Sequence, residues 1–464
     1  MSYSFVLQIH ENETGRIKNN KNQQMKVLKF GGTSVGSVEN MCNVKHIIND
    51  GRKKVVVLSA MSGTTNQLVS IAQDIDASKP NDAIDKINKL HETYFNTIDK
   101  LLSNPVLNKD VKNYVSSIFE VLVECTYKDF SETVENQILA QGELLSTYMF
   151  NSYLKQEGVR ASLLPALNFM RIDAFKEPNI DYIKEHFESV LNNAEDSEIY
   201  ITQGFICLDD EGNISNLQRG GSDFTATIIG AAIKAEEVQI WTDIDGMHNN
   251  DPRYVENTSA ISNLSFEEAA ELAYFGAKIL HPQTVTPVRK DSIPVRLKNT
   301  MKPDAHGTLI STSTSGNGIK AIAAKDNITA IKIKSARMLQ AHGFLKKVFE
   351  IFETYQTSID MITTSEVAVS LTIDDDKNLE NILTELEKIA SIEVDKNQSI
   401  VCLVGHSVVN HQDTYKLFQI LQDVKIRMIS YGGSKNNISL LIDSKDKINT
   451  LQKLNDYLFE LVTL

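Results

Sequence analysis

Residues 26–36 read KVLKFGGTSVG, a short apolar stretch that runs into two glycines and a pair of hydroxyl residues. The pattern predicts a β-strand that stops at Gly31 and Gly32 and turns directly into a helix, for which Ser37 is a good N-cap. Glycine lets a backbone approach a ligand closely, and the amide groups at a helix start attract phosphate. With Lys29 at the strand end, the stretch could cradle a phosphate, although such a turn is often purely structural.

The stretch matches neither of the two best-known glycine patterns of nucleotide-binding proteins. A P-loop has its lysine after the glycine run and before Ser or Thr, and the dinucleotide fingerprint is G-x-G-x-x-G. Residues 26–36 contain neither pattern. The function therefore has to be inferred from the rest of the chain.

Composition and charge are those of an ordinary globular enzyme. The chain has 464 residues, 42% of them hydrophobic and 23% charged, a length that fits about three domains. Its formal net charge of −13 disfavours partners such as nucleic acid or an anionic membrane. Four scattered cysteines without a C-x-x-C pair argue against a disulfide framework or a zinc site. No apolar run reaches the roughly 18 residues of a membrane helix. The scattered cysteines fit a reducing compartment, so we expect a cytoplasmic protein.

The first 24 residues differ from the rest of the chain. Apart from an apolar cluster at residues 5–7 they are polar, and they lack the features of a signal peptide. We expect residues 1–24 to be a disordered extension. Met25, one residue before the first strand, is an alternative start.

Further strand–turn–helix units follow along the chain. Residues 55–58, 198–202 and 238–243 read as strands, and polar, glycine-containing turns precede helices at residues 59–66 and 217–226. Because ligands of open α/β sheets gather at the carboxyl ends of strands, we expect the turn that begins at Gly31 and the turn at residues 59–66 to face one crevice. The repetition predicts a mainly parallel α/β sheet with helices on both faces.

Two helical segments carry unusual polar residues. Residues 81–152 read as helical, with Glu143 in the middle, where a glutamate is usually a solvated surface residue. A Ser-x-x-Glu capping box at residues 265–268 opens another helix, which closes at FGAKILHP, residues 275–282. Within that motif we predict His281 to be a structural cap.

The last third of the chain contains an internal repeat. A Ser/Thr/Gly run at residues 311–318 is the predicted domain boundary. Beyond it, residues 345–352 resemble residues 415–421, and residues 371–374 resemble residues 440–443. Each copy reads as an α+β unit, so we expect two small modules packed sheet to sheet or edge to edge, better suited to binding than to catalysis.

Taken together, these motifs resemble those of the aspartate kinases, members of the amino acid kinase family with C-terminal ACT domains. The resemblance runs from Met25 to the C-terminus. It rests on KFGGTSV at 29–35, GELLS at 142–146, RGGSD at 219–223, WTD at 241–243 with DPR at 251–253, and FGAKILHP at 275–282. It implies a carbamate-kinase-like, mainly parallel α/β sheet with helices on both faces, followed by two ferredoxin-like ACT domains.

The family pattern, in which the first ACT domain is inserted into the second, also implies the domain boundaries. The kinase domain would comprise residues 25–310, followed by the linker at residues 311–318. The first ACT domain would comprise residues 327–395. The second would comprise residues 319–326 together with residues 396–464.

The resemblance implies transfer of the γ-phosphoryl group of ATP, with Mg²⁺, to the β-carboxylate of L-aspartate. The product, 4-phospho-L-aspartate, is the first intermediate of lysine, threonine and methionine biosynthesis. A carboxylate nucleophile is already ionised at neutral pH, so catalysis rests on positioning and on charge neutralisation rather than on a general base. Lys29 and Asp223 are the implied catalytic residues, and no metal site built from protein side chains alone is expected.

The matching positions of the family imply two sets of ligand contacts. ATP would contact Lys29, Phe30, Gly31, Gly32, Ser34, Thr242, Asp243, His248, Arg253 and Lys278. L-aspartate would contact Thr65, Glu143, Arg219, Ser222 and Asp223. Arg219 would pair with its α-carboxylate and Glu143 would meet its α-ammonium group. His248 stands where relatives commonly carry a tyrosine beside the adenine, which leaves that contact open.

The first ACT module resembles that of single-function, lysine-sensitive aspartate kinases. The implied effector-binding residues are Met338, Gly343, Phe344, Leu345, Ser358, Ile359, Asp360, Thr364, Ser365 and Glu366. Asp360 and Glu366 would accept an ammonium group. Ala341 replaces a serine often found there, so L-threonine is the rival of L-lysine as allosteric inhibitor. The family also implies a homodimer formed through the ACT domains.

Two other functions compete with this interpretation. Another acyl-phosphate-forming kinase, acting on glutamate or N-acetylglutamate, would share the phosphate site, but Arg219 and Glu143 favour a free amino acid. An inactive amino-acid sensor that kept the fold is the second alternative. The intact Lys29, Arg219 and Asp223 argue against it.

Overall fold

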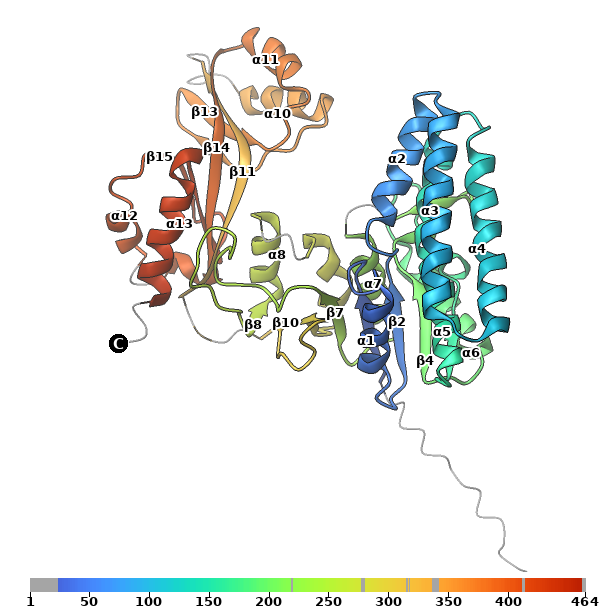
Figure 1. Cartoon of the computed structure of the whole chain (residues 1–464). Coiled ribbons are helices and arrows are strands. Elements are labelled where there is room, and N and C mark those ends of the chain that lie inside the picture. The colour runs from blue at the N-terminus through green and yellow to red at the C-terminus, as the bar shows by residue number, and fades with distance from the viewer. Residues whose placement is uncertain are drawn as a thin grey trace, which may run out of the picture.

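The computed structural model describes residues 24–217, 220–276, 280–313, 316, 318–335, 342–410 and 414–460. These residues form an eight-stranded sheet, a six-stranded sheet and a small two-stranded hairpin (Figure 1). The strands are β1 (Lys26–Phe30), β2 (Lys54–Leu58), β3 (Ala161–Leu163), β4 (Ile199–Gln203), β5 (Ile206–Leu208), β6 (Ile214–Asn216), β7 (Val238–Thr242), β8 (Asn263–Ser265), β9 (Val295–Asn299), β10 (Thr308–Ser311), β11 (Gly318–Lys334), β12 (Ile362–Thr364), β13 (Ala368–Ile373), β14 (Ser391–His406), β15 (Ile426–Tyr431) and β16 (Asn437–Asp443). The α-helices are α1 (Val38–Ile48), α2 (Thr64–Asp76), α3 (Pro80–Leu101), α4 (Pro105–Cys125), α5 (Glu132–Gln156), α6 (Ile180–Asn193), α7 (Gly221–Ala232), α8 (Phe266–Tyr274), α9 (Thr286–Arg289), α10 (Phe344–Thr354), α11 (Leu379–Glu387), α12 (Lys416–Ile420) and α13 (Lys447–Asn455).

The eight-stranded sheet has the order β3-β4-β2-β1-β7-β9-β10-β8. All neighbouring strands are parallel except β9 and β10. The quoted stretch supplies β1, which pairs with β2 on one side and β7 on the other. Because parallel strands end at the same edge of a sheet, the turns after these three strands lie close together.

Helices cover both faces of this sheet, as predicted, because the strands bury both of their faces. Along β2, Val55 and Val57 pack into a core that includes α6 and α7, while Val56 and Leu58 pack into a second core with α1, α2 and α5. The helical stretch predicted over residues 81–152 is three helices rather than one. Asn104, an N-cap followed by a proline, and Ser131, a second N-cap, begin α4 and α5. Within the described residues, no helix is both long and apolar enough to cross a membrane.

The six-stranded sheet contains the internal repeat and is antiparallel throughout, in the order β12-β13-β11-β14-β16-β15. The long strands β11 and β14 pass through both halves, so the two predicted modules are joined edge to edge in one sheet. Their pairing changes register between Lys325 and Ile328, where Asn327 and Asn397 both have positive φ angles, of 61° and 58°. We propose that this point is the boundary between the two ACT domains, the first inserted into the second.

Helix α8 lies between the two sheets (Figure 1). It packs on β8 at one end and on β11 and β14 of the six-stranded sheet along its length. Just after it, Gly276 has a φ of 123°, and a Cβ there would lie 2.2 Å from the carbonyl oxygen of Ala324 in β11. Only glycine allows this approach between the end of α8 and β11.

Gly276→Ala is expected to lower the free energy of unfolding by about 2–4 kcal/mol, because both the backbone angle and the contact with β11 become strained. Urea denaturation followed by circular dichroism measures this change. Gly212→Ala is the control, since Gly212 also has a positive φ, of 89°, but a Cβ there meets nothing within 4 Å. A loss of stability no larger than that of the control, about 1 kcal/mol, would contradict the packing argument.

Candidate active site

The turns after β1, β2 and β4 are joined by backbone hydrogen bonds at the carboxyl edge of the sheet. The amide of Ser59 donates to the carbonyl of Phe30 at 3.2 Å, and the amide of Ser62 donates to that of Gly32 at 3.0 Å. The amide of Gly204 donates to Leu58 at 2.9 Å. The turns that the sequence placed at one crevice therefore form one continuous surface.

Lys29 and Asp223 meet on this surface, although they are far apart in the sequence. Lys29 is on β1, Asp223 is in the first turn of α7, and Nζ lies 2.7 Å from Oδ1. The two side chains are 12% and 16% exposed, so the pair is mostly shielded from water. A cation in such surroundings acts strongly on a nearby anion, because the local dielectric constant is low.

Glycines allow the turns to pack this closely. A Cβ at Gly32 would lie 2.9 Å from the carbonyl oxygen of Ala60, and one at Gly204 would lie 2.4 Å from Cβ of Ser222. Ser222 also accepts a hydrogen bond from Ser59, with 2.9 Å between the two Oγ atoms. The glycine pair of the quoted stretch thus brings the β1 turn against the β2 turn.

The helix starts at this surface differ in how they are capped. Ser37, the predicted N-cap of α1, accepts a hydrogen bond from the amide of Asn40. Helices α2 and α7 instead follow Gly63 and Gly220, whose φ angles are 81° and 76°, and neither has a side-chain cap. The amides best able to bind an anion therefore belong to α2 and α7 as well as to the quoted stretch, and both helices follow glycine-containing turns that the sequence analysis singled out. A glycine immediately before a helix was the available signal.

Glu143 of α5 is buried beneath the β2 turn and is not a solvated residue. Its side chain accepts a hydrogen bond from the amide of Ala60, 3.1 Å from Oε1, while Oε2 is buried without a partner. The residue is 4% exposed, and burial raises the pKa of its carboxyl to about 8. A buried carboxylate oxygen without a partner is costly, which makes it a suitable acceptor for a ligand's ammonium group.

The neighbouring threonines have different environments. Thr64 is buried, and its hydroxyl lies 3.1 Å from that of Tyr94. Thr65, the residue predicted to contact aspartate, is exposed in the first turn of α2. Its side chain is therefore accessible to a ligand.

Two of the residues predicted to contact ATP have side chains that point into the protein. Phe30 is fully buried and stacks on Trp241, with ring centroids 5.6 Å apart. Ser34 is buried as well, and its Oγ lies 2.7 Å from Oγ1 of Thr300. Phe30 and Ser34 can therefore contact a nucleotide mainly through their backbones.

Four of the predicted ATP contacts lie at the end of β7 and in the loop that follows it. At the strand end, the hydroxyl of Thr242 donates to Asp243 at 3.2 Å. In the loop, the ring of His248 lies between Asp245 and Thr258, 2.8 and 3.0 Å away. The guanidinium of Arg253 binds Asp251 in the same loop through two nitrogens. The assignment of these residues to a nucleotide stays a prediction.

Arg219, Lys278 and Met338 lie outside the described residues. Gly220, next to Arg219, packs closely against the last part of the FGAKILHP motif: a Cβ there would lie 2.9 Å from Cβ of His281. His281 caps a short 3₁₀ helix, Pro282–Val285, by accepting a hydrogen bond from the amide of Gln283, as predicted. The RGGSD and FGAKILHP motifs are therefore in contact.

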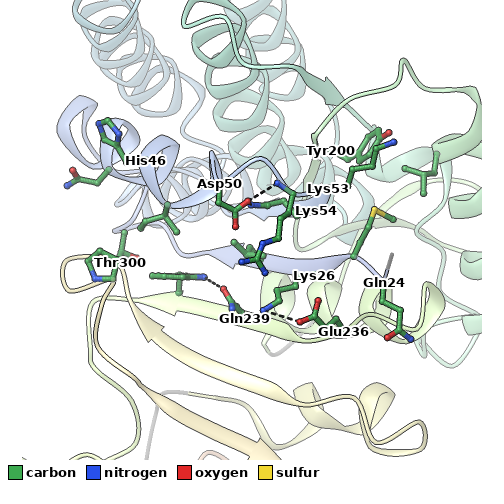
Figure 2. A pocket seen from close by; sticks show the side chains of 18 of the residues that line it. Gln24, Lys26, His46, Asp50, Lys53, Lys54, Tyr200, Glu236, Gln239 and Thr300 are labelled. Carbon is green, nitrogen blue, oxygen red and sulfur yellow. Dashed lines mark hydrogen bonds and ion pairs between the residues drawn. The ribbon is translucent and has the colours of Figure 1, made fainter. Parts of the chain in front are cut away.

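A cavity of about 1140 Å³ lies at the opposite edge of the sheet, at the amino ends of β1, β2 and β7 (Figure 2). Several charges that line it are paired with one another: Lys54 with Asp50, and Lys26 with Glu236 at 3.4 Å. None of the predicted site residues lines this cavity. The candidate active site is therefore the surface around Lys29 and Asp223, not this cavity.

Comparison with known proteins identifies the family. The sequence profile of the amino acid kinase family matches residues 24–299, and that of the ACT domain matches residues 401–458. The lysine-sensitive aspartokinase 3 of Escherichia coli is 35% identical over 448 residues, which cover 94% of this chain and 99% of that protein. The chain belongs to the aspartokinases.

Two solved structures of Escherichia coli aspartokinase III support this. The complex with aspartate and ADP, the R-state, has a TM-score of 0.81 at 33% identity and covers 94% of this chain and 100% of that one. The complex with lysine and aspartate, the T-state, has a TM-score of 0.77 at 33% identity and covers 94% and 99%. The predicted family and fold class are confirmed, and this aspartokinase is a phosphotransferase with a carboxyl group as acceptor.

The predicted effector residues of this aspartokinase are centred on the start of α10 and on Asp360. Gly343, with a φ of 87°, precedes α10, and no side chain caps that helix. Phe344 and Ile359 belong to one apolar core. Leu345, Ser358 and Glu366 are exposed, Ser365 bonds to the backbone of Ala368, and Thr364 is in β12.

Asp360 has contacts that the sequence did not predict. Its Oδ1 accepts from the hydroxyl of Tyr274, in α8, at 2.7 Å, and from Nζ of Lys325, in β11, at 2.8 Å. Its Oδ2 is buried without a partner. The predicted effector carboxylate is thus bonded directly to the helix that precedes the FGAKILHP motif.

Proposed function

We propose that this aspartokinase transfers the γ-phosphoryl group of ATP to the β-carboxylate of L-aspartate and that L-lysine inhibits it. The observation that carries the catalytic part is the shielded Lys29–Asp223 pair beside the uncapped start of α7. Phosphoryl transfer to a carboxylate needs positioning and neutralisation of negative charge, and these groups provide both. The related E. coli enzyme has been solved with aspartate and ADP.

The buried Glu143 supports an amino acid as the acceptor substrate. Its partnerless Oε2 is suited to the α-ammonium group of aspartate, and Arg219 is the proposed partner of the α-carboxylate. Mg²⁺ would accompany ATP and neutralise phosphate charge. We propose that this ion is held mainly through phosphate and water oxygens, which is how Mg²⁺ usually binds beside a nucleotide.

The regulatory part of the proposal rests on Asp360. Its buried and partnerless Oδ2 is suited to an ammonium group of lysine, and lysine sensitivity is named for the E. coli relative. We further propose a cytoplasmic homodimer formed through the ACT domains. L-threonine is the competing effector.

The test is a coupled assay of ADP release with L-aspartate, L-glutamate or N-acetyl-L-glutamate, each with and without L-lysine or L-threonine. We expect aspartate to be the single acceptor of the three that supports turnover, and we expect L-lysine to suppress that turnover. Turnover with another acceptor would overturn the substrate assignment. Turnover of aspartate without suppression by lysine would overturn the regulatory part, and amino-acid binding without any turnover would favour an inactive sensor.

A further inference from the structure

One face of α8 contacts residues in, or just before, strands of the six-stranded sheet through three side chains spaced three residues apart. Glu268 pairs with Lys320 at 2.9 Å, Glu271 accepts a hydrogen bond from Asn437, and Tyr274 donates to Asp360. Residues with this spacing lie on one face of a helix. Helix α8 is therefore attached to the regulatory part of the chain at several points, and only the last of them reaches a predicted effector residue.

The contact between Tyr274 and Asp360 is part of a shielded charge cluster. The Asp360 side chain is 1% exposed, and Lys325 binds both Asp360 and Asp374 at 2.8 Å. The Lys325 ammonium also lies 4.6 Å from the centre of the Tyr274 ring. Burial and the hydrogen bond to Asp360 raise the pKa of the Tyr274 hydroxyl, so it remains a donor.

The two oxygens of Asp360 are used differently. Oδ1 accepts from both Tyr274 and Lys325, whereas Oδ2 is buried without a partner. An ammonium group that bound Oδ2 would share the single negative charge of the carboxylate and repel Lys325. Since hydrogen bonds to a full charge are the stronger ones, the bond from the Tyr274 hydroxyl would weaken.

The other end of this connection is the active site. Tyr274 is the last residue of α8, and residues 275–282 follow it directly. Gly220 packs against His281 and is the residue from which α7 starts, two positions before Ser222 and three before Asp223. A displacement of the end of α8 would therefore reach Ser222, a proposed aspartate contact, and Asp223, which pairs with Lys29.

We propose that Tyr274 couples the effector site to the active site by sharing the Asp360 carboxylate with the bound effector. The inference rests on the proposed function, since it takes L-lysine as the effector. Tyr274 acts as a positioning residue: its hydroxyl holds α8 in the active arrangement when Oδ2 is free and releases it when an ammonium group occupies Oδ2.

The experiment measures L-lysine binding by calorimetry, with and without saturating aspartate and ADP, together with inhibition in the coupled assay. Coupling is reciprocal, so aspartate and ADP should weaken lysine binding to the wild-type chain, by about 5–150-fold. In Tyr274→Phe we expect lysine to bind the free enzyme with a dissociation constant within about threefold of wild type. The coupling factor, which is the ratio of the lysine dissociation constants with and without aspartate and ADP, should fall about tenfold or to unity, because a hydrogen bond to a charged group is gone. Inhibition by lysine should weaken by the same factor.

Tyr431→Phe is the matched control. Its hydroxyl donates to the carbonyl of Val409 at 2.6 Å, and it lies on β15, an edge strand of the six-stranded sheet. Inhibition of Tyr274→Phe equal to wild type would overturn the proposal, and so would an equal loss of coupling in Tyr431→Phe. Failure of Tyr274→Phe to bind lysine would make Tyr274 part of the effector pocket instead. A wild-type chain that neither binds lysine nor is inhibited by it would refute the proposed regulation and, with it, this inference.

Discussion

Lys29→Met is expected to lower kcat for ADP formation from aspartate and ATP by about 10²–10³-fold or more. The lysine places a positive charge in a shielded site, 2.7 Å from Asp223, and removing one preorganised donor from such a site typically has this effect. Methionine keeps most of the apolar stem of lysine and none of its charge. Steady-state kinetics measures the change.

Lys26→Met is the matched control for this prediction. Lys26 lies on the same strand, at its amino end, and pairs with Glu236 at 3.4 Å. We expect its kcat to stay within about twofold of wild type, because Lys26 lies at the amino end of β1, away from the carboxyl edge where Lys29 meets Asp223. The double variant Lys29→Met/Asp223→Asn tests for misfolding, because it leaves no unpaired charge at the site. A kcat of Lys29→Met within tenfold of wild type, in a folded protein, would contradict the catalytic assignment.

Glu143→Gln is expected to raise KM for aspartate about 100-fold and to change KM for ATP by less than about twofold. The substitution removes the charge that would pair with the α-ammonium group in a buried position, where loss of one partner is expensive. Glu157→Gln, at the end of the same helix and paired with Lys45, is the control. Equal changes in both KM values for Glu143→Gln would assign the residue to structure rather than to aspartate binding.

Because the pKa of Glu143 is raised, the same assignment also predicts that aspartate binding releases a proton. With a pKa of about 8, the free carboxyl is mostly protonated at pH 7, and binding of the aspartate ammonium group should ionise it. Aspartate binding should therefore release most of one proton, measurable by calorimetry in two buffers of different ionisation enthalpy. Glu143→Gln should release none, and equal release by both proteins would contradict the assignment.

The same pKa fixes the sign of a pH effect on stability. The folded chain holds the Glu143 proton up to about pH 8, whereas an unfolded glutamate loses it near 4.5. The contribution of Glu143 to the free energy of unfolding is therefore full below pH 4.5 and is lost as the pH rises to about 8. Glu143→Gln should remove this part of the pH dependence.

Patterns among neighbouring residues predicted the helices and strands well, and contacts between residues far apart in the sequence explain what those patterns missed. The N-cap at Ser37 and the buried strand at residues 55–58 depend on neighbouring residues only, and both are present. Glu143 is buried because α5 runs beneath the β2 turn, a contact between residues 83 positions apart, which no helical periodicity encodes. Its predicted role came from the family motif alone.

The contact between Tyr274 and Asp360 could not be predicted for a similar reason. The two residues are 86 positions apart and belong to different domains of the proposed division. Phe30 was predicted from its motif to contact a ligand, but its position in β1 places its ring in the core. It lies two residues after Leu28, on the same face of the strand, and both side chains pack into one core.

The long strands β11 and β14 have a mechanical consequence. They span 17 and 16 residues and run through both halves of the six-stranded sheet, so continuous strands rather than a linker connect the two halves. The pairing of these two strands is irregular where Asn327 and Asn397 have positive φ angles. Lys325, the partner of Asp360, is two residues from this joint. A displacement of the effector carboxylate would therefore act, through Lys325, close to the point where the regular pairing of β11 and β14 is broken.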